Sequence, residues 1–243
     1  MTQVLLIRHG INDMVGQKKL AGWLPGVHLN DEGRAQAEAL AERLRDVPIS
    51  AIYCSPLERT QETAAPLAER TGLPVQIREG LGEVRYGDWT GQPIEELAKH
   101  ELWRVVQTYP SGMRFPGGDS MREMQARIVG EIEAIAADHP RDIVAIISHA
   151  DLIKSALAHY LGVHFDLFQR IGVNPCSVSV LHLTRFGPHI VRINDDGPLK
   201  LEPEKEEQPP AAEQSQQAAT DGPTSADGAQ AAPASDHQPT AVE

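Results

Sequence analysis

Two unbroken apolar runs, residues 4–7 and 143–147, constrain the fold more than any other part of the sequence. A short run that is apolar at every position is typical of a strand buried on both faces of a sheet. The first run leads into Arg8 and His9, and the second leads through a serine into His149. Because ligands of open α/β sheets bind beyond the carboxyl ends of such strands, we expect both histidines at a binding edge of the sheet.

Strand-like and helix-like segments alternate along the rest of the chain. Further strands are expected over residues 50–54, 74–77, 178–183 and 189–193, and helices over residues 31–46, 55–70, 95–109, 120–138 and 151–161. The last two strands flank a Phe-Gly-Pro turn and are expected to form a hairpin. This alternation predicts an α/β fold, a three-layer α/β/α sandwich with a mostly parallel sheet.

The start of the second expected helix has a capping pattern. Ser55 and Glu58 have capping-box spacing, Pro56 would occupy the first helical position, and the helix at residues 120–138 begins with the same spacing. Arg59 then falls in the first helical turn. Free backbone N–H groups at a helix N-terminus favour a bound anion, and an arginine there adds a bidentate donor.

The composition changes abruptly after Leu201. Residues 202–243 contain no aromatic residue, are rich in Pro, Ala and Gln, and carry nine acidic residues against one lysine. Such a segment buries too little apolar surface to offset its ordering entropy, so a disordered tail is expected after a folded domain of residues 1–201. The net charge of the whole chain is −12, which argues against a nucleic-acid partner.

The remaining composition favours a cytoplasmic protein. Cys54 and Cys176 flank strand-like sequence and are expected to be small buried side chains, with neither a disulfide nor a metal site. No apolar run approaches the roughly 20 residues of a membrane span, and the N-terminus lacks the parts of a signal peptide. No membrane partner is therefore expected.

Two histidines, two arginines and an acid-bearing, glycine-rich loop at residues 79–91 suit phosphoryl transfer. Fixed arginines neutralise the charge on the transferred group. A neutral imidazole can attack phosphorus, and a carboxylic acid can protonate the leaving oxygen. The expected partner is a small phosphorylated molecule.

Four motifs, in this order, resemble those of the histidine phosphatase superfamily, which includes phosphoglycerate mutases and many phosphatases. They are Leu-Ile-Arg-His-Gly at residues 6–10, Tyr-Cys-Ser-Pro-Leu-Glu-Arg-Thr-Gln-Glu-Thr-Ala at residues 53–64, Glu-Val-Arg-Tyr-Gly-Asp-Trp-Thr-Gly at residues 83–91 and Ser-His at residues 148–149. The resemblance covers residues 3–194. It implies a phosphoglycerate mutase-like fold and chemistry with neither a metal nor another cofactor.

The resemblance also implies roles for matching residues. His9 would be the phosphorylated nucleophile, while Arg8, Arg59 and His149 would hold the phosphoryl oxygens. The expected substrate-binding residues are Arg8, Asn12, Gly22, Arg59, His149 and Ala150.

Glu83 matches the proton donor of the family. A carboxyl group must be protonated to act as an acid at neutral pH, so the pKa of Glu83 is expected to be raised, with a nearby phosphate dianion as the cause. Glu79 and Asp88 are weaker candidates for the same role.

Several positions depart from the family pattern. Many members have Thr or Ser where this chain has Asn12, and Asn where it has Val15. Asn12 can still donate a hydrogen bond to phosphate, whereas Val15 cannot. Asp151 and Lys154 are also unusual and would either line the substrate site or form a surface salt bridge.

The short segment 92–118 and Trp89 favour the phosphatase branch, because mutases carry a longer, arginine-rich insertion there. The expected function is a metal-independent phosphomonoester hydrolase that forms a phosphohistidine. A mutase-type phosphotransferase and a non-catalytic phosphate-binding module with an adaptor tail remain alternatives. Specificity is expected from residues 11–29 and 84–118. The candidates there are Lys18, Lys19, Arg85, Tyr86, Trp89, Arg104 and Arg114.

Overall fold

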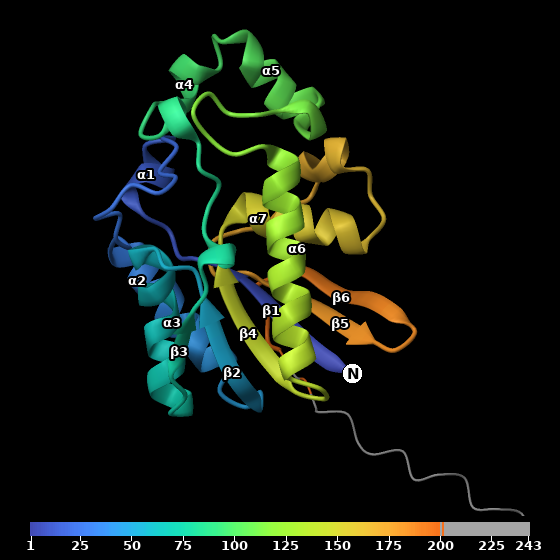
Figure 1. Ribbon diagram of the computed structural model, residues 1–243. Helices are drawn as coiled ribbons and strands as arrows, with labels where there is room; N and C mark the ends of the chain where they lie inside the picture. Colours follow the sequence, from blue (N-terminus) through green and yellow to red (C-terminus); the bar gives the residue numbers. More distant parts are fainter. Residues whose placement is uncertain (200, 202–243) are drawn as a thin grey trace, which may run out of the picture. The chain divides into compact units, whose positions relative to one another are not determined.

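A six-stranded sheet is the framework of the fold (Figure 1). The computed structural model describes residues 1–199 and residue 201. The sheet order is β3-β2-β4-β1-β5-β6; the first four strands are parallel, β5 is antiparallel to β1, and β6 is antiparallel to β5. The strands are β1 (Thr2–Arg8), β2 (Ile49–Cys54), β3 (Val75–Ile77), β4 (Ile143–Ser148), β5 (Val178–Thr184) and β6 (Gly187–Asp195). The expected mostly parallel sheet is confirmed, and so is the C-terminal hairpin.

Helices cover both faces of this sheet, so the expected three-layer arrangement is confirmed (Figure 1). One face carries α2 (Asp31–Arg43) and α3 (Glu58–Thr71), and the other carries α6 (Met121–Asp138) and α7 (Ala150–Tyr160). Along β1 the buried side chains alternate between the two cores. Val4 and Leu6 pack in the core under α6 and α7, whereas Leu5 and Ile7 pack in the core under α2 and α3.

The register of the central strands decides where the histidines lie. β1 and β4 are neighbouring parallel strands, and Arg8 pairs with Ser148 at their carboxyl ends. The next residue of each strand is a histidine, and the backbone N–H of His9 donates to the carbonyl of Ser148 at 3.0 Å. The two apolar runs of the sequence therefore deliver His9 and His149 side by side.

The start of α3 differs from the expectation. This helix begins at Glu58, its N-cap is Leu57, and no side chain caps it, so the predicted capping box of Ser55 and Glu58 is wrong. The hydroxyl of Ser55 instead lies 2.8 Å from Nε2 of His149. The capping box at the start of α6 is confirmed.

The single helix expected over residues 95–109 is also wrong, because it divides into α4 (Ile94–Leu97) and α5 (Glu101–Thr108). A short helix, α1 (Asp13–Gly16), lies in the segment expected to be a loop. The remaining elements are the short 3-10 helices Glu79–Leu81, Gly87–Trp89, Pro110–Gly112 and Phe165–Arg170. Cys54 and Cys176 are buried with free thiols, as expected.

The predicted acidic tail, residues 202–243, lies outside the described residues. Within the described part of the chain, none of the helices has both the length and the apolar character that crossing a membrane requires.

Candidate active site

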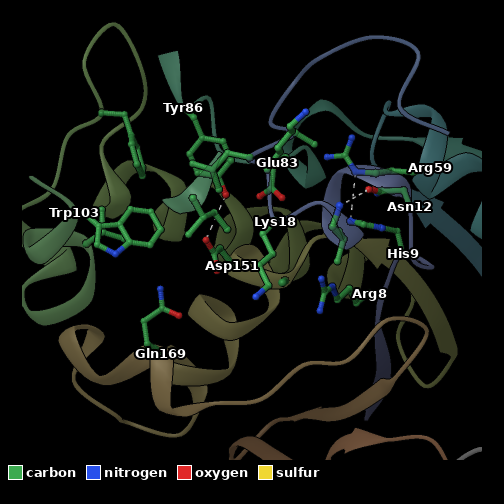
Figure 2. Close-up of a pocket in the computed structure, with 18 of the residues that line it drawn as sticks. Arg8, His9, Asn12, Lys18, Arg59, Glu83, Tyr86, Trp103, Asp151 and Gln169 are labelled. Atoms are coloured by element: carbon green, nitrogen blue, oxygen red, sulfur yellow. Dashed lines mark hydrogen bonds between the residues drawn. The ribbon is translucent and has the colours of Figure 1, made fainter. Parts of the chain in front are cut away.

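A pocket of about 330 Å³ opens beyond the carboxyl ends of β1 and β4 (Figure 2). Its inner end is lined by Arg8 and His9 from β1, Asn12 from the following loop, Arg59 from α3 and Glu83. Five of the residues predicted for the site therefore meet in one cavity. Ala150, at the first position of α7, also lines it.

The hydrogen bonds of His9 fix which ring nitrogen carries the proton and which one keeps a lone pair. Nδ1 lies 2.7 Å from the carbonyl oxygen of Gly10, which can only accept, so Nδ1 carries the proton. Nε2 accepts a hydrogen bond from Nε of Arg59 at 3.3 Å. A neutral ring in this tautomer leaves the Nε2 lone pair directed toward the cluster of donors.

The surroundings keep this ring neutral. His9 is 4% exposed. Burial lowers the pKa of His9 well below its ordinary value, and the positive charges of Arg59 and Arg8 lower it further. A neutral imidazole is the nucleophilic form.

Arg59 holds the two histidines and a loop together. Its Nη2 donates to the carbonyl oxygen of Gly22 at 3.0 Å and lies 3.2 Å from Nδ1 of His149. The side chain is 1% exposed, and burial lowers its pKa. Because an arginine remains charged in a protein, the cluster contains a buried fixed cation.

Three buried donors in this cluster have no hydrogen-bond partner among the described residues. They are Nε of Arg8, Nδ2 of Asn12 and Nη1 of Arg59. An unsatisfied buried donor costs roughly 1–3 kcal/mol, and more when it is charged. An anion with several acceptor oxygens would satisfy all three, so the donor set fits a phosphoryl group.

His149 lies behind this cluster. It is fully buried, and its ring centroid is 5.2 Å from that of His9. Nδ1 accepts from Arg59, so Nε2 carries the proton and donates to the hydroxyl of Ser55 at 2.8 Å. Burial, followed by the charge of Arg59, lowers the pKa of His149 well below its ordinary value. The ring therefore orients Arg59 without adding a further positive charge.

Glu83 lies at the pocket wall next to the histidines. The side chain of Glu83 is 12% exposed, and its Oε2 is 3.7 Å from Nδ1 of His149. Burial raises the pKa of Glu83 to about 7, and the negative charge of Asp151 contributes to the rise. The predicted direction of the shift is confirmed, although the fold itself causes it before any phosphate binds.

The backbone around Glu83 is held from two sides. Nε1 of Trp23 donates to the carbonyl oxygen of Glu83 at 2.6 Å. Arg127, on α6, donates to the carbonyl oxygens of Gly80 at 2.9 Å, of Gly82 at 2.7 Å and of Glu83 at 3.2 Å. These bonds fix the turn that carries the carboxyl group.

Asp119 extends this support. Its carboxylate lies 3.6 Å from Arg127 and accepts the backbone N–H of Arg85 at 3.0 Å. The segments before and after Glu83 are thereby tied to one ion pair.

Several sequence-predicted residues lie outside the cavity. Gly22 and His149 do not line it and act on the site through Arg59. Trp89 is 5% exposed and packs against Phe115 in the core, so its expected contact with the leaving group is wrong. The other candidates that do not line this pocket are Glu79, Arg85, Asp88, Arg104 and Arg114.

Asp151 combines both roles that the sequence left open. It lines the cavity and also lies 3.6 Å from the ammonium group of Lys154. Lys18, Lys19 and Tyr86 line the cavity as expected.

Some residues of the site have no functional signal in the sequence. Ser55 has the spacing of a helix cap, and Arg127 has the spacing of an ordinary helical arginine. Trp103 and Gln169 line the pocket from segments far apart in the chain. Their involvement depends on tertiary contacts that one sequence does not display.

Among the described residues, no group of three His, Cys, Asp or Glu side chains is arranged to hold a metal ion.

Comparison with known proteins assigns the family. A family model of the histidine phosphatase superfamily, branch 1, matches residues 4–196. The chain belongs to the histidine phosphatase superfamily. The match spans every residue of the site.

Similar proteins in this superfamily are named both as phosphatases and as probable mutases. Phosphoserine phosphatase 1 of Hydrogenobacter thermophilus is 29% identical over 196 residues, which is 80% of this chain and 92% of that protein. Probable phosphoglycerate mutase GpmB of Cronobacter sakazakii is 30% identical, covering 74% of this chain and 84% of that protein. The structure of a mycobacterial glucosyl-3-phosphoglycerate phosphatase has a TM-score of 0.72 and 27% identity, covering 79% of this chain and 98% of that one.

The raised pKa of Glu83 predicts a stabilising substitution. From its ordinary value of 4.5 up to about 7, the folded protein keeps a proton that the unfolded chain releases, so stability falls as the pH rises through this window. Glu83→Gln removes this loss. We expect similar free energies of unfolding for the variant and the wild type near pH 4, and a gain of up to about 3 kcal/mol for the variant near pH 8.

Urea unfolding at the two pH values measures this difference. Glu79→Gln changes an exposed carboxylate four residues away and should give a much smaller difference between the two pH values. A Glu83→Gln variant that is less stable than the wild type near pH 8 would contradict the assignment.

Proposed function

We propose that the protein is a metal-independent phosphomonoester hydrolase that forms a phosphohistidine at His9. The observation that carries the proposal is the set of three unpartnered donors, on Arg8, Asn12 and Arg59, beside the unprotonated Nε2 of His9. Donors placed before the substrate arrives stabilise transition-state charge without reorganisation. Side chains of this chain alone would supply the nucleophile, the charge neutralisation and the acid.

In the first step, Nε2 of His9 attacks phosphorus opposite the ester oxygen. The N–P bond forms as the P–O bond to the leaving group breaks. Arg8, Arg59 and Asn12 hold the three equatorial oxygens, over which the transition state spreads its charge. Glu83 transfers its proton to the leaving oxygen, so the product is a neutral alcohol and Glu83 becomes a carboxylate.

In the second step, that carboxylate removes a proton from water as the water oxygen attacks the phosphohistidine. The N–P bond breaks, inorganic phosphate is released, and Nε2 of His9 regains its lone pair. Glu83 is protonated again at the end of the cycle. A pKa of about 7 suits a group that gives a proton in one step and takes one in the next.

Hydrolysis is favoured over transfer between two positions of phosphoglycerate. A mutase must hold a second phosphate or a carboxylate beside the transferred group. Here the far wall of the pocket carries Asp151 and Gln169. Of the cationic residues considered from the sequence, Lys18 and Lys19 line the pocket, whereas Arg85, Arg104 and Arg114 do not. The relatives named as probable mutases keep phosphotransfer as the second candidate.

Hydrolysis of p-nitrophenyl phosphate in EDTA tests the proposal. We expect turnover by the wild type and a loss of at least about 1,000-fold in kcat for His9→Ala, because the covalent step is removed. His189→Ala, at an exposed position on β6, is the matched control. Turnover by His9→Ala near the wild-type rate would contradict the proposal, as would turnover that EDTA abolishes.

The contacts of Arg127 predict a substrate-dependent defect. Nitrophenolate leaves without a proton, whereas an alkoxide needs one, so a displaced Glu83 should matter only for alkyl esters. For Arg127→Met we expect kcat/KM for methyl phosphate to fall about tenfold more than that for p-nitrophenyl phosphate.

Arg185→Met, on the exposed turn of the hairpin, is the matched control and should leave both values near those of the wild type. A general loss of folded protein would lower kcat/KM for both substrates by the same factor. An equal loss for Arg127→Met would therefore show that Arg127 does not position the acid.

A further inference from the structure

The pocket continues well beyond the groups that the proposed reaction needs. His9, Arg8 and Arg59 lie at one end, and Trp103 and Gln169 lie at the other, with Asp151 between them (Figure 2). At about 330 Å³, the cavity is in the range of pockets that enclose a whole small ligand. The far end must therefore contact the leaving group of the substrate.

An aromatic ring forms one side of this far end. Trp103 lies on α5 and is partly exposed to the pocket. Trp89 backs it, with ring centroids 6.1 Å apart and the rings tilted by 34°. Trp89 in turn packs edge-on against Phe115 at 5.4 Å. The indole of Trp103 is thus supported as a flat apolar surface.

Two polar side chains, those of Asp151 and Gln169, form the other side, and Lys154 contacts both of them. The ammonium group of Lys154 lies 3.6 Å from Oδ1 of Asp151 and donates to Oε1 of Gln169 at 3.2 Å. The hydrogen bond from Lys154 orients the amide of Gln169, whose NH₂ group can donate to a ligand. Tyr86 donates to Oδ2 of Asp151 at 3.4 Å, and this carboxylate keeps further acceptor capacity.

This combination of groups fits neighbouring hydroxyls on a ring. Sugars and cyclitols present C–H faces to aromatic rings, and their hydroxyls both donate and accept. One hydroxyl can donate to Asp151 while another accepts from Gln169. We propose that the far end binds a neutral polyhydroxylated leaving group, so that the substrate is the phosphate ester of a sugar or a cyclitol. This inference rests on the proposed hydrolase function.

Charged leaving groups fit the same wall less well. An ammonium group that approached Asp151 would also approach Lys154, and a carboxylate that approached Gln169 would face Asp151. Lys18 and Lys19 also line the pocket; Lys18 is solvent-exposed and Lys19 is half-buried. Because water screens an exposed ammonium, Lys18 contributes little to holding a carboxylate.

A substrate panel tests this proposal. Release of inorganic phosphate is measured with glucose 6-phosphate, myo-inositol 1-phosphate, phosphoserine, 3-phosphoglycerate and methyl phosphate. Methyl phosphate needs the same acid catalysis but does not reach the far end. We expect kcat/KM for at least one of the two polyol phosphates to exceed those for phosphoserine, 3-phosphoglycerate and methyl phosphate by about tenfold or more.

Two variants locate the preference on this wall. Gln169→Leu keeps the size of the side chain and removes its donor, so the ratio of kcat/KM for the preferred polyol phosphate to that for methyl phosphate should fall about tenfold. Trp103→Leu should lower the same ratio, mainly through KM, and Trp103→Phe should restore part of it. Gln76→Leu, on the exposed surface of β3, makes the same change as Gln169→Leu away from the site and is the control.

The outcomes separate the two proposals. Hydrolysis of p-nitrophenyl phosphate that depends on His9, with phosphoserine or 3-phosphoglycerate as the best natural ester, would overturn the polyol assignment alone. A polyol preference that Gln169→Leu and Trp103→Leu leave unchanged would overturn the assignment of this wall. The absence of any His9-dependent hydrolysis would overturn the proposed function itself.

Discussion

The buried guanidinium of Arg59 is the group on which the rest of the site depends. It contacts both histidines and the carbonyl oxygen of Gly22. Among the described residues, it has no carboxylate within ion-pair distance. A buried cation without an ion-pair partner is costly, and its unpartnered Nη1 adds to the cost. The site is therefore arranged for an anion that the protein itself does not supply.

Burial and uncompensated charge also set the protonation states of His9 and Glu83. Burial and the charges of Arg59 and Arg8 keep His9 neutral, which is the form that the proposed attack on phosphorus requires. Burial raises the pKa of Glu83 to about 7, so this carboxyl group can hold the proton that the proposed acid needs. Each effect costs folding free energy, because the unfolded chain would ionise these groups more readily. The proposed catalytic groups therefore lower the stability of the fold, and the two buried apolar cores of the sheet must offset this loss.

The sequence predicted the parts of the site that depend on strands. The apolar runs before His9 and His149 require buried strands, and parallel pairing of those strands brings the histidines together. A periodic pattern predicted the core methionines of α6, of which Met121 and Met124 are fully buried. Local patterns of this kind are read directly from residue spacing.

The features that the sequence did not predict depend on contacts between distant segments of the chain. Ser55 has the spacing of a helix cap, yet its hydroxyl is taken by His149 from another strand. Trp89 and Trp103 are both tryptophans in neighbouring segments. Only packing decides that Trp103 faces the pocket while Trp89 packs behind Trp103. Arg127 looks like a surface residue of a helix until the glycine-rich turn folds against it. No spacing rule within one sequence distinguishes these cases.

The most direct test of the account is to trap the covalent intermediate. The enzyme is mixed with an excess of p-nitrophenyl phosphate, quenched in alkali within the first turnover, digested and analysed by mass spectrometry. The account predicts one added phosphoryl group, located on His9 and absent from His9→Ala. Phosphate found on any other residue would contradict it, as would rapid turnover in which no phosphoryl enzyme forms.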